Sequence, residues 1–130
     1  MDKLPVNQLT VKTMIKYWLP VFVYAVFIFY LSSIQSPDTQ PIFPHFDKCV
    51  HFGLYFFLGI LFIRAFTHQE IIIARHLAFW YSVLLTSGYG LTDEIHQYFV
   101  PSRHCDLWDF VADSIGGVSG ISVYLLWIKK

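Results

Sequence analysis

The sequence predicts an all-α integral membrane protein, a bundle of four transmembrane helices. Of its 130 residues, 55% are hydrophobic and only 14% are charged, whereas soluble domains carry about a quarter charged residues. The mean hydropathy is +0.51. The apolar residues gather in long runs, and because only helices and closed barrels cross lipid, runs of this length indicate helices.

The first apolar run covers residues 15–34 and follows a mixed polar segment, residues 1–14, for which we expect a short cytoplasmic tail. A cleaved signal peptide is the alternative. No A-x-A-like site follows the run, and three more apolar segments come after it, so the pattern favours an uncleaved first span. Residues 35–46 contain three prolines and therefore predict a loop.

Three further spans are predicted, and with the first they form one domain over residues 15–130. The second runs from Asp47 to Phe66, the third from His76 to Leu91 with helix continuing to Tyr98, and the fourth from Leu107 to Ile128. A short connection at residues 67–75 and a turn around Pro101 separate them. No repeat or second domain is visible.

The basic residues are distributed unevenly between the two sides that four spans would create. With the N-terminus inside, the cytoplasmic side holds Lys3, Lys12, Lys16, Arg64, Arg75, Lys129 and Lys130, and the outer side holds Lys48 and Arg103. Cytoplasmic loops carry the excess of Lys and Arg. We therefore expect a multi-pass protein of the bacterial cytoplasmic (inner) membrane with both termini in the cytoplasm. Its partner is the lipid bilayer, and nothing indicates nucleic-acid binding.

Polar residues follow one face of each of the last three predicted helices, at spacings of three and four residues. These faces comprise Asp47, His51 and Tyr55; then Ser82, Thr86, Gly90, Asp93 and Gln97 with His96 beside them; then Asp109, Asp113, Gly116, Gly117 and Gly120. Gly116 and Gly120 form a small-xxx-small pair that lets helices approach closely. The carboxylates on that face should therefore point into the bundle, toward one outward-facing pocket with Lys48 and Arg103 as counter-charges.

Some of these residues also have simpler explanations. Asp106 and Asp109 begin a helix, where carboxylates cap free N–H groups. Asp113 lies one turn deeper, so capping explains it poorly and a functional role or a buried network is favoured. His51 follows Asp47 by four residues, and the two could form a hydrogen-bonded pair that joins helices.

Two cysteines and the histidines raise further possibilities. Cys49 and Cys105 both fall on the predicted outer side, where a disulfide can persist, but their separation in space is open. A metal site from His51, His96 and the carboxylates is conceivable. No H-E-x-x-H or comparable spacing supports it, so we predict no metal and no cofactor.

Three ordered motifs resemble those of the VanZ-like family of small integral membrane proteins. They are Asp47-Lys48-x-x-His51-Phe52-x-x-Tyr55, then Thr92-Asp93-Glu94-Ile95-His96-Gln97-x-Phe99-Val100-Pro101-x-Arg103, then Asp109-x-x-x-Asp113-x-x-Gly116. The family's founding member is linked to resistance against teicoplanin, a glycopeptide that binds cell-wall precursors. Two positions differ from the family's usual pattern, with Ser102 in place of Gly and Asp113 in place of Asn.

Three functions are compatible with these observations. The resemblance implies a membrane protein that acts at the outer face on a lipid-linked or cell-surface ligand and lowers glycopeptide susceptibility. A second hypothesis is a membrane-embedded enzyme, in which Asp93 or Glu94 is the base and His96 carries protons. In a third, the polar residues form a structural network without a ligand. The predicted binding residues are Asp47, Lys48, His51, Tyr55, Gln97, Arg103, Asp109 and Asp113. Whether the protein is an enzyme, and its oligomeric state, stay open.

Overall fold

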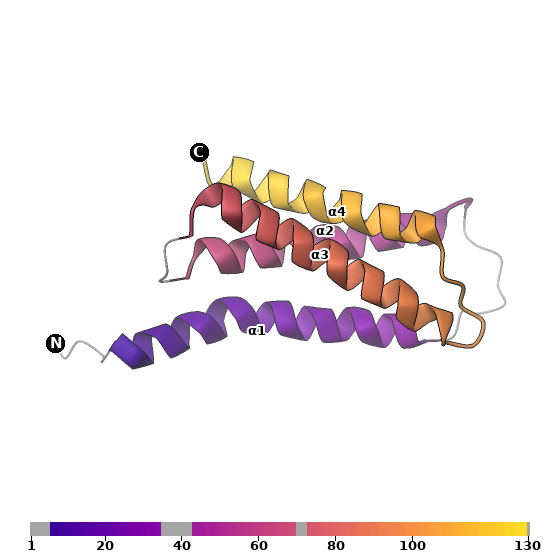
Figure 1. Cartoon of the computed structure of the whole chain (residues 1–130), viewed down its shortest axis with the longest axis horizontal. Coiled ribbons are helices and arrows are strands. Elements are labelled where there is room, and N and C mark those ends of the chain that lie inside the picture. Colours follow the sequence, from indigo (N-terminus) through magenta and orange to yellow (C-terminus); the bar gives the residue numbers. More distant parts are fainter. Residues whose placement is uncertain (1–5, 35–42, 70–72, 130) are drawn as a thin grey trace.

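The protein is a bundle of four α-helices. Its computed structural model describes residues 6–34, 43–69 and 73–129, and within these ranges the helices are α1 (Val6–Ser33), α2 (Phe46–Thr67), α3 (Arg75–Tyr98) and α4 (Leu107–Trp127). Successive helices run in opposite directions, so the start of α1 and the end of α4 lie at the same end of the bundle (Figure 1). The all-α prediction is confirmed.

The helix ends differ from the predicted ones mainly at the start of the chain. α1 begins at Val6, so residues 6–14, which were expected as a tail, are helical. The Pro-rich loop lies mostly outside the described residues, which resume at residue 43. The other three helices begin and end within a few residues of the predicted positions.

Three helices are long and apolar enough to cross a membrane, namely residues Val11–Ser33 of α1 together with the whole of α2 and α4. α3 has 24 residues, which is long enough for the hydrocarbon core. It does not reach the same apolar level in the described residues, because one of its faces carries hydroxyl, amide and carboxyl side chains. The composition of the helices therefore supports three of the four predicted spans.

α2 and α4 make the closest helix contact in the bundle. Gly116 and Gly120 of α4 lie directly against the backbone of Phe52 and Phe56 in α2, and a Cβ atom at either glycine would overlap a carbonyl oxygen. The predicted small-xxx-small contact is thus confirmed. It turns the acidic face of α4 inward, and Asp113 is fully buried.

α3 packs against both α2 and α4 through the polar face that the sequence predicted. Its buried residues are Ala78, Ser82, Thr86, Gly90, Asp93, Glu94 and Gln97. Gly90 of α3 lies against Asp113, since a Cβ there would lie 3.0 Å from the Asp113 side chain. At the other end of the bundle Ile63, Ala78, Ile121 and Tyr124 form an apolar cluster that joins the same three helices.

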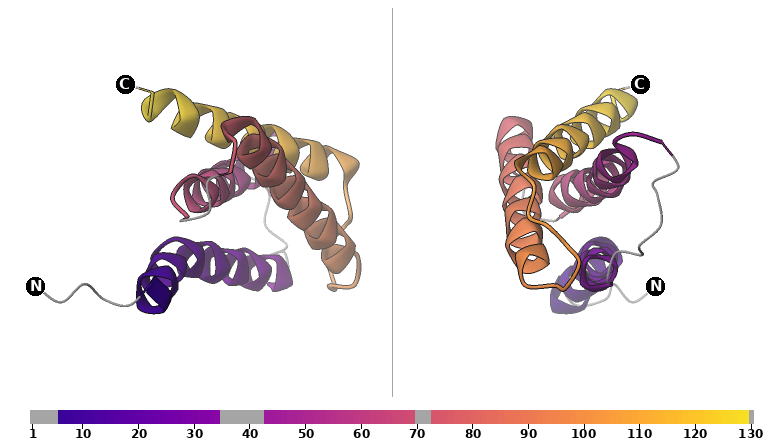
Figure 2. Two further views of the ribbon diagram at one scale, coloured as in Figure 1. Left: turned by 60° about the vertical axis from the view of Figure 1, so that its left-hand side comes forward. Right: turned by 90° about the vertical axis from the view of Figure 1, so that its right-hand side faces the viewer.

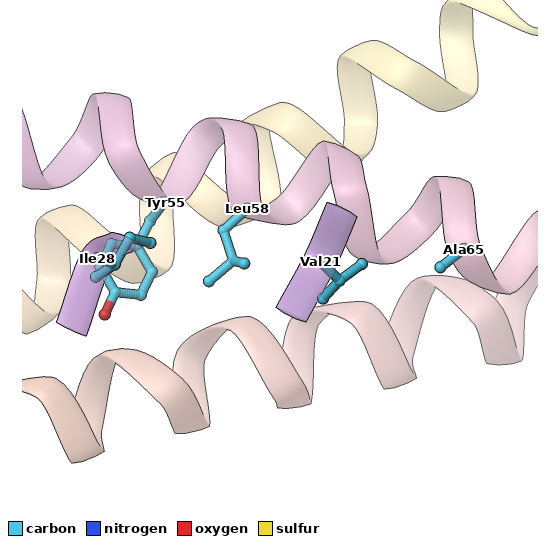
Figure 3. Packing of buried hydrophobic residues seen from close by; sticks show 5 residues of the cluster. All are labelled: Val21, Ile28, Tyr55, Leu58 and Ala65. Carbon is cyan, nitrogen blue, oxygen red and sulfur yellow. The ribbon is translucent and has the colours of Figure 1, made fainter. Parts of the chain in front are cut away.

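α1 is the outlying helix. It packs on α2 and α3, and in the described residues it makes no packing contact with α4 (Figure 2). A core of Val21, Ile28, Tyr55, Leu58 and Ala65 joins it to α2 (Figure 3). Its remaining surface exposes large apolar side chains such as Phe22, which is 71% exposed, and such a surface suits contact with lipid.

Candidate functional site

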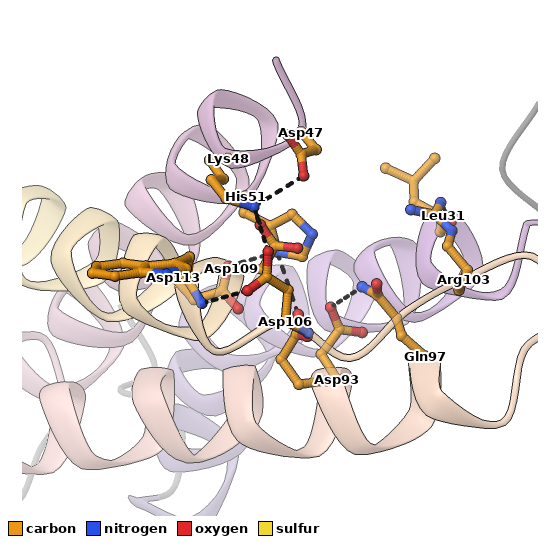
Figure 4. A network of polar contacts seen from close by, with 12 residues as sticks. Leu31, Asp47, Lys48, His51, Asp93, Gln97, Arg103, Asp106, Asp109 and Asp113 are labelled. Carbon is orange, nitrogen blue, oxygen red and sulfur yellow. Dashed lines mark hydrogen bonds and ion pairs between the residues drawn. The ribbon is translucent and has the colours of Figure 1, made fainter. Parts of the chain in front are cut away.

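Charged and polar side chains collect at one end of the bundle, where α2 and α4 begin and α3 ends (Figure 4). We call this group the polar cluster and define it as Asp47, Lys48, His51, Asp93, Glu94, Asp106, Asp109 and Asp113. α2, α3, α4 and the loop before α4 all contribute to it. Sequence analysis predicted that polar residues of three helices point toward one pocket, and most of this group lies together in that way.

Lys48 is the cation at the centre of the outer part of the polar cluster. Its Nζ donates to Asp106 at 2.7 Å, to Asp109 at 2.9 Å and to Asp47 at 3.1 Å. The Lys48 side chain is 23% exposed and that of Asp109 is 8% exposed, whereas Asp47 is open to solvent. A lysine whose three donors are committed in this way acts as a positioning charge that ties α2 to α4.

Asp106 joins the loop, α3 and α4, whereas sequence analysis predicted only a capping role for it. It is the N-cap of α4, where its Oδ1 accepts from the backbone N–H of Trp108 at 2.9 Å. Its own backbone N–H donates to Oε2 of Glu94 at 2.9 Å. The hydrogen bond from Lys48, and after it the one from Trp108, lowers the pKa of the Asp106 carboxyl below its usual value. Asp106 precedes Asp109 by three residues, so both lie at the start of α4.

His51 and Asp113 form the buried inner part of the polar cluster. Nδ1 of His51 donates to Oδ1 of Asp113 at 2.9 Å, and it lies 3.8 Å from Oε1 of Glu94. The side chains of Asp113 and Glu94 are 0% and 3% exposed. Thus His51 pairs across to α4, and not with Asp47 on its own helix as one alternative had it.

Several buried oxygen atoms beside this pair have no hydrogen-bond partner within the described residues. They are Oε1 of Glu94, Oδ2 of Asp113 and the hydroxyl of Tyr55. Buried polar atoms are rarely left unpaired, and each unpaired one costs about 1–3 kcal/mol. The hydroxyls of Ser32, Thr86 and Ser114 are also buried without a partner in the described residues. The two carboxylate oxygens differ from these hydroxyls because they lie beside an imidazole, which makes this the candidate binding site.

Asp93 and its neighbours on α3 extend the polar cluster only in part. Asp93 is 6% exposed and accepts from Nε2 of Gln97 at 3.3 Å. His96 points elsewhere. Its ring stacks on Phe29 of α1 with 4.4 Å between centroids, and its Nε2 lies 3.0 Å from the hydroxyl of Ser33. His96 thus belongs to the α1–α3 contact, which the spacing of residues within α3 does not disclose.

Arg103 also contacts α1. Its Nε donates to the backbone carbonyl of Ile34 at 3.0 Å, and its Nη2 donates to that of Leu31 at 3.2 Å. These carbonyls lie at the C-terminus of α1, where helical carbonyls lack partners. Figure 4 shows Arg103 beside Leu31, apart from Lys48. These two hydrogen bonds place the charge of Arg103 at the end of α1, whereas the sequence predicted it in the pocket with Lys48.

A turn positions Arg103. The N–H of Arg103 donates to the carbonyl of Val100 at 3.1 Å, Pro101 occupies the second position of that turn, and Ser102 has φ 64°. A turn with proline second and a positive φ third is type II, in which glycine is preferred third. This geometry therefore favours glycine at position 102.

Three cluster residues from three different helices could hold a metal ion. Donor atoms of His51, Glu94 and Asp109 all lie within 4.8 Å of one another, and all three residues are buried. No sequence motif could reveal this set, because each ligand comes from a separate helix. The two cysteines are free and exposed thiols.

Comparison with known proteins gives one match. The model of the VanZ/LLP1 family matches residues 5–128, nearly the whole chain. No curated protein and no solved structure matches significantly. The match includes every residue of the polar cluster and the turn before Arg103. With its apolar helices, the protein is a membrane protein, and it belongs to the VanZ/LLP1 family.

Proposed function

We propose that this protein acts at the outer face of the bacterial cytoplasmic membrane, where its polar cluster binds a lipid-linked or cell-surface ligand of the envelope. By binding this ligand, the protein lowers the susceptibility of the cell to teicoplanin. The observation that carries the proposal is the polar cluster itself, a group of carboxylates with a lysine and a histidine at one end of an apolar bundle. Four of the carboxylates are buried, those of Asp93, Glu94, Asp109 and Asp113. Charge inside a membrane protein is costly and is typical of a functional site.

The proposal treats α3 as a fourth span. α3 has 24 residues, so at 1.5 Å per residue it is about 36 Å long, enough to cross a hydrocarbon core of about 30 Å. Its polar face is covered by α2 and α4, and polar side chains in spans face the bundle interior. A low mean hydropathy is therefore compatible with a helix that crosses the membrane among others.

With four spans, both termini lie on the same side of the membrane. The distribution of Lys and Arg then indicates which side that is. Arg64, Arg75 and Lys129 lie at the end of the bundle opposite the polar cluster, because they close α2, open α3 and follow α4. The positive-inside rule assigns that end to the cytoplasm. The polar cluster then faces outward, toward the cell-wall precursors that glycopeptides bind.

A susceptibility assay tests this function. A teicoplanin-sensitive Gram-positive host would carry the wild type, Asp109→Asn, Glu94→Gln, the control His76→Gln or an empty vector, with membrane levels matched by immunoblot. His76 is exposed at the start of α3, at the other end of the bundle. We expect protection from the wild type and His76→Gln, and loss of protection in both cluster variants. Absence of protection by the wild type at matched levels would contradict the resistance function.

A second candidate function is a membrane-embedded enzyme, and the unpaired Oε1 of Glu94 favours it. This oxygen lies 3.8 Å from Nδ1 of His51, and a carboxylate with a free oxygen beside an imidazole is suited to accept a proton. Glu94 is then the base and His51 takes the place of His96 as the partner, since His96 contacts α1. Retention of ligand binding by Glu94→Gln, together with complete loss of activity, would favour the enzyme over a binding protein.

A further inference from the structure

The donor set of His51, Glu94 and Asp109 contains one imidazole and two carboxylates, contributed by α2, α3 and α4. This mixture of nitrogen and oxygen donors suits Zn²⁺ and related transition-metal ions better than Mg²⁺ or Ca²⁺, which prefer oxygen alone. We propose that these three residues bind one divalent transition-metal ion of the Zn²⁺ type. The inference rests on the proposed function insofar as it concerns the same polar cluster.

The distances are close to those of a metal site. Metal–ligand distances of about 2.0–2.2 Å put neighbouring donors of a tetrahedral site about 3–3.6 Å apart. Here Oε1 of Glu94 lies 3.8 Å from Nδ1 of His51, and the three residues offer donor atoms within 4.8 Å of one another. A metal ion on Nδ1 would replace the proton that this nitrogen shares with Asp113. If the side chains moved inward by about 1 Å, the donor atoms would reach the separations of a tetrahedral site. Three protein ligands would leave the fourth position of that site open for a further ligand.

The unpaired oxygens point to a cation independently of the donor spacing. Glu94 is 2% exposed, and its Oε1 has no hydrogen-bond partner in the described residues, as is true of Oδ2 of Asp113. Oε2 of Glu94, by contrast, is held by the backbone N–H of Asp106. A carboxylate with one oxygen held and the other free in a buried position has the arrangement of a metal ligand supported by its surroundings.

The charge balance favours the same conclusion. Lys48 donates to Asp47, Asp106 and Asp109, so its single positive charge is already shared among three carboxylates. Glu94 and Asp113 remain, both buried, and in the described residues their ion-pair partner is His51. Buried charges require a partner, and a divalent ion among these groups would supply it.

The test measures metal on the purified full-length chain, without an affinity tag that binds metals, in detergent. Cys49→Ser and Cys105→Ser form the background, because both free thiols are exposed and would bind metal on their own. Protein stripped with a chelator is titrated with Zn²⁺ and analysed by mass spectrometry of metal content. We expect about one Zn²⁺ per chain, with affinity at least about tenfold weaker in Asp109→Asn and Glu94→Gln. The matched control His104→Gln, an exposed imidazole in the loop, should bind like the background.

A second measurement needs no substitution of a proposed metal ligand. The same background loaded with Mn²⁺ should show coupling to one imidazole nitrogen in pulsed electron paramagnetic resonance, because His51 is the one nitrogen ligand proposed. Substoichiometric Zn²⁺ binding, equal binding by the two ligand variants and the background, or absence of the nitrogen coupling would each overturn the proposal. The readouts do not depend on teicoplanin, so metal binding without protection would reject only the resistance function, and protection without metal would reject only the metal site.

Discussion

Nδ1 of His51 in α2 lies 2.9 Å from Oδ1 of Asp113 in α4, in the buried centre of the bundle. This hydrogen bond needs an acceptor at residue 113 and does not need a charge. An asparagine offers a carbonyl oxygen in nearly the same place.

We expect Asp113→Asn to keep the free energy of unfolding within about 1 kcal/mol of the wild type, because the hydrogen bond to His51 persists. Asp113→Ala should lose about 1–3 kcal/mol, since His51 would be left unpaired in a buried position. Unfolding by SDS in mixed micelles, followed by circular dichroism, measures both. Equal stability of the alanine variant and the wild type would mean that the pair does not hold α2 to α4.

The glycine contact between α2 and α4 gives a second prediction. Gly120→Leu should destabilise the protein by about 3 kcal/mol or more, because any Cβ there overlaps the backbone at Phe56, and overpacking between fixed backbones cannot relax. Gly53→Ala is the matched control. A Cβ at Gly53 meets nothing within 4 Å, so the alanine should leave stability unchanged or raise it by up to about 1 kcal/mol through helix propensity.

The same unfolding assay compares the stability of Gly120→Leu with that of Gly53→Ala. A Gly120→Leu protein as stable as Gly53→Ala would show that α4 does not approach α2 this closely.

The turn before Arg103 gives a third prediction. Ser102 has φ 64°, a left-handed conformation that costs a residue with a side chain about 1–2 kcal/mol. Glycine adopts it freely but loses about 0.5–1 kcal/mol more conformational entropy on folding. Ser102→Gly should therefore stabilise the protein by up to about 1 kcal/mol, and Ser102→Val should destabilise it. The opposite order of the two variants would contradict the type II turn.

The exposed thiols test the orientation of the bundle. Cys49 and Cys105 are free and exposed at the end that we assign to the outside. A membrane-impermeant charged maleimide should label both in intact cells. In a background lacking both thiols, Lys129→Cys should be labelled only after the membrane is permeabilised, because that residue lies at the opposite end. Labelling of Lys129→Cys in intact cells would reverse the proposed orientation.

Residues within one helix were the easiest to predict from the sequence. The buried face of α3 and the Asp–Gly face of α4 follow from helical periodicity, which fixes the angle between residues of one helix. His96 and Arg103 were placed in the pocket because they are polar and near it in sequence. Their actual contacts are with α1, and periodicity within α3 carries no information on how α1 lies against it.

Cross-helix partnerships were the hardest to predict. The three acceptors of Lys48 come from α2, the loop and α4, so only the folded chain brings them together. The same holds for the metal-ligating set, whose members have no common motif. In the described residues α3 is less apolar than the other three helices, because one of its faces is polar. Hydropathy is read from one helix alone, so it does not register that α2 and α4 cover this face.

The order of the helices along the chain has a consequence for biosynthesis. α4 supplies Asp109 and Asp113 and, at its N-cap, Asp106, yet it is translated after α2 and α3. Until it emerges, Lys48, His51 and Glu94 have none of their partners from α4, and the glycine contact that holds α2 does not exist. These groups therefore obtain their partners from α4 only after α4 has been made, and the polar cluster is complete only in the last step of assembly.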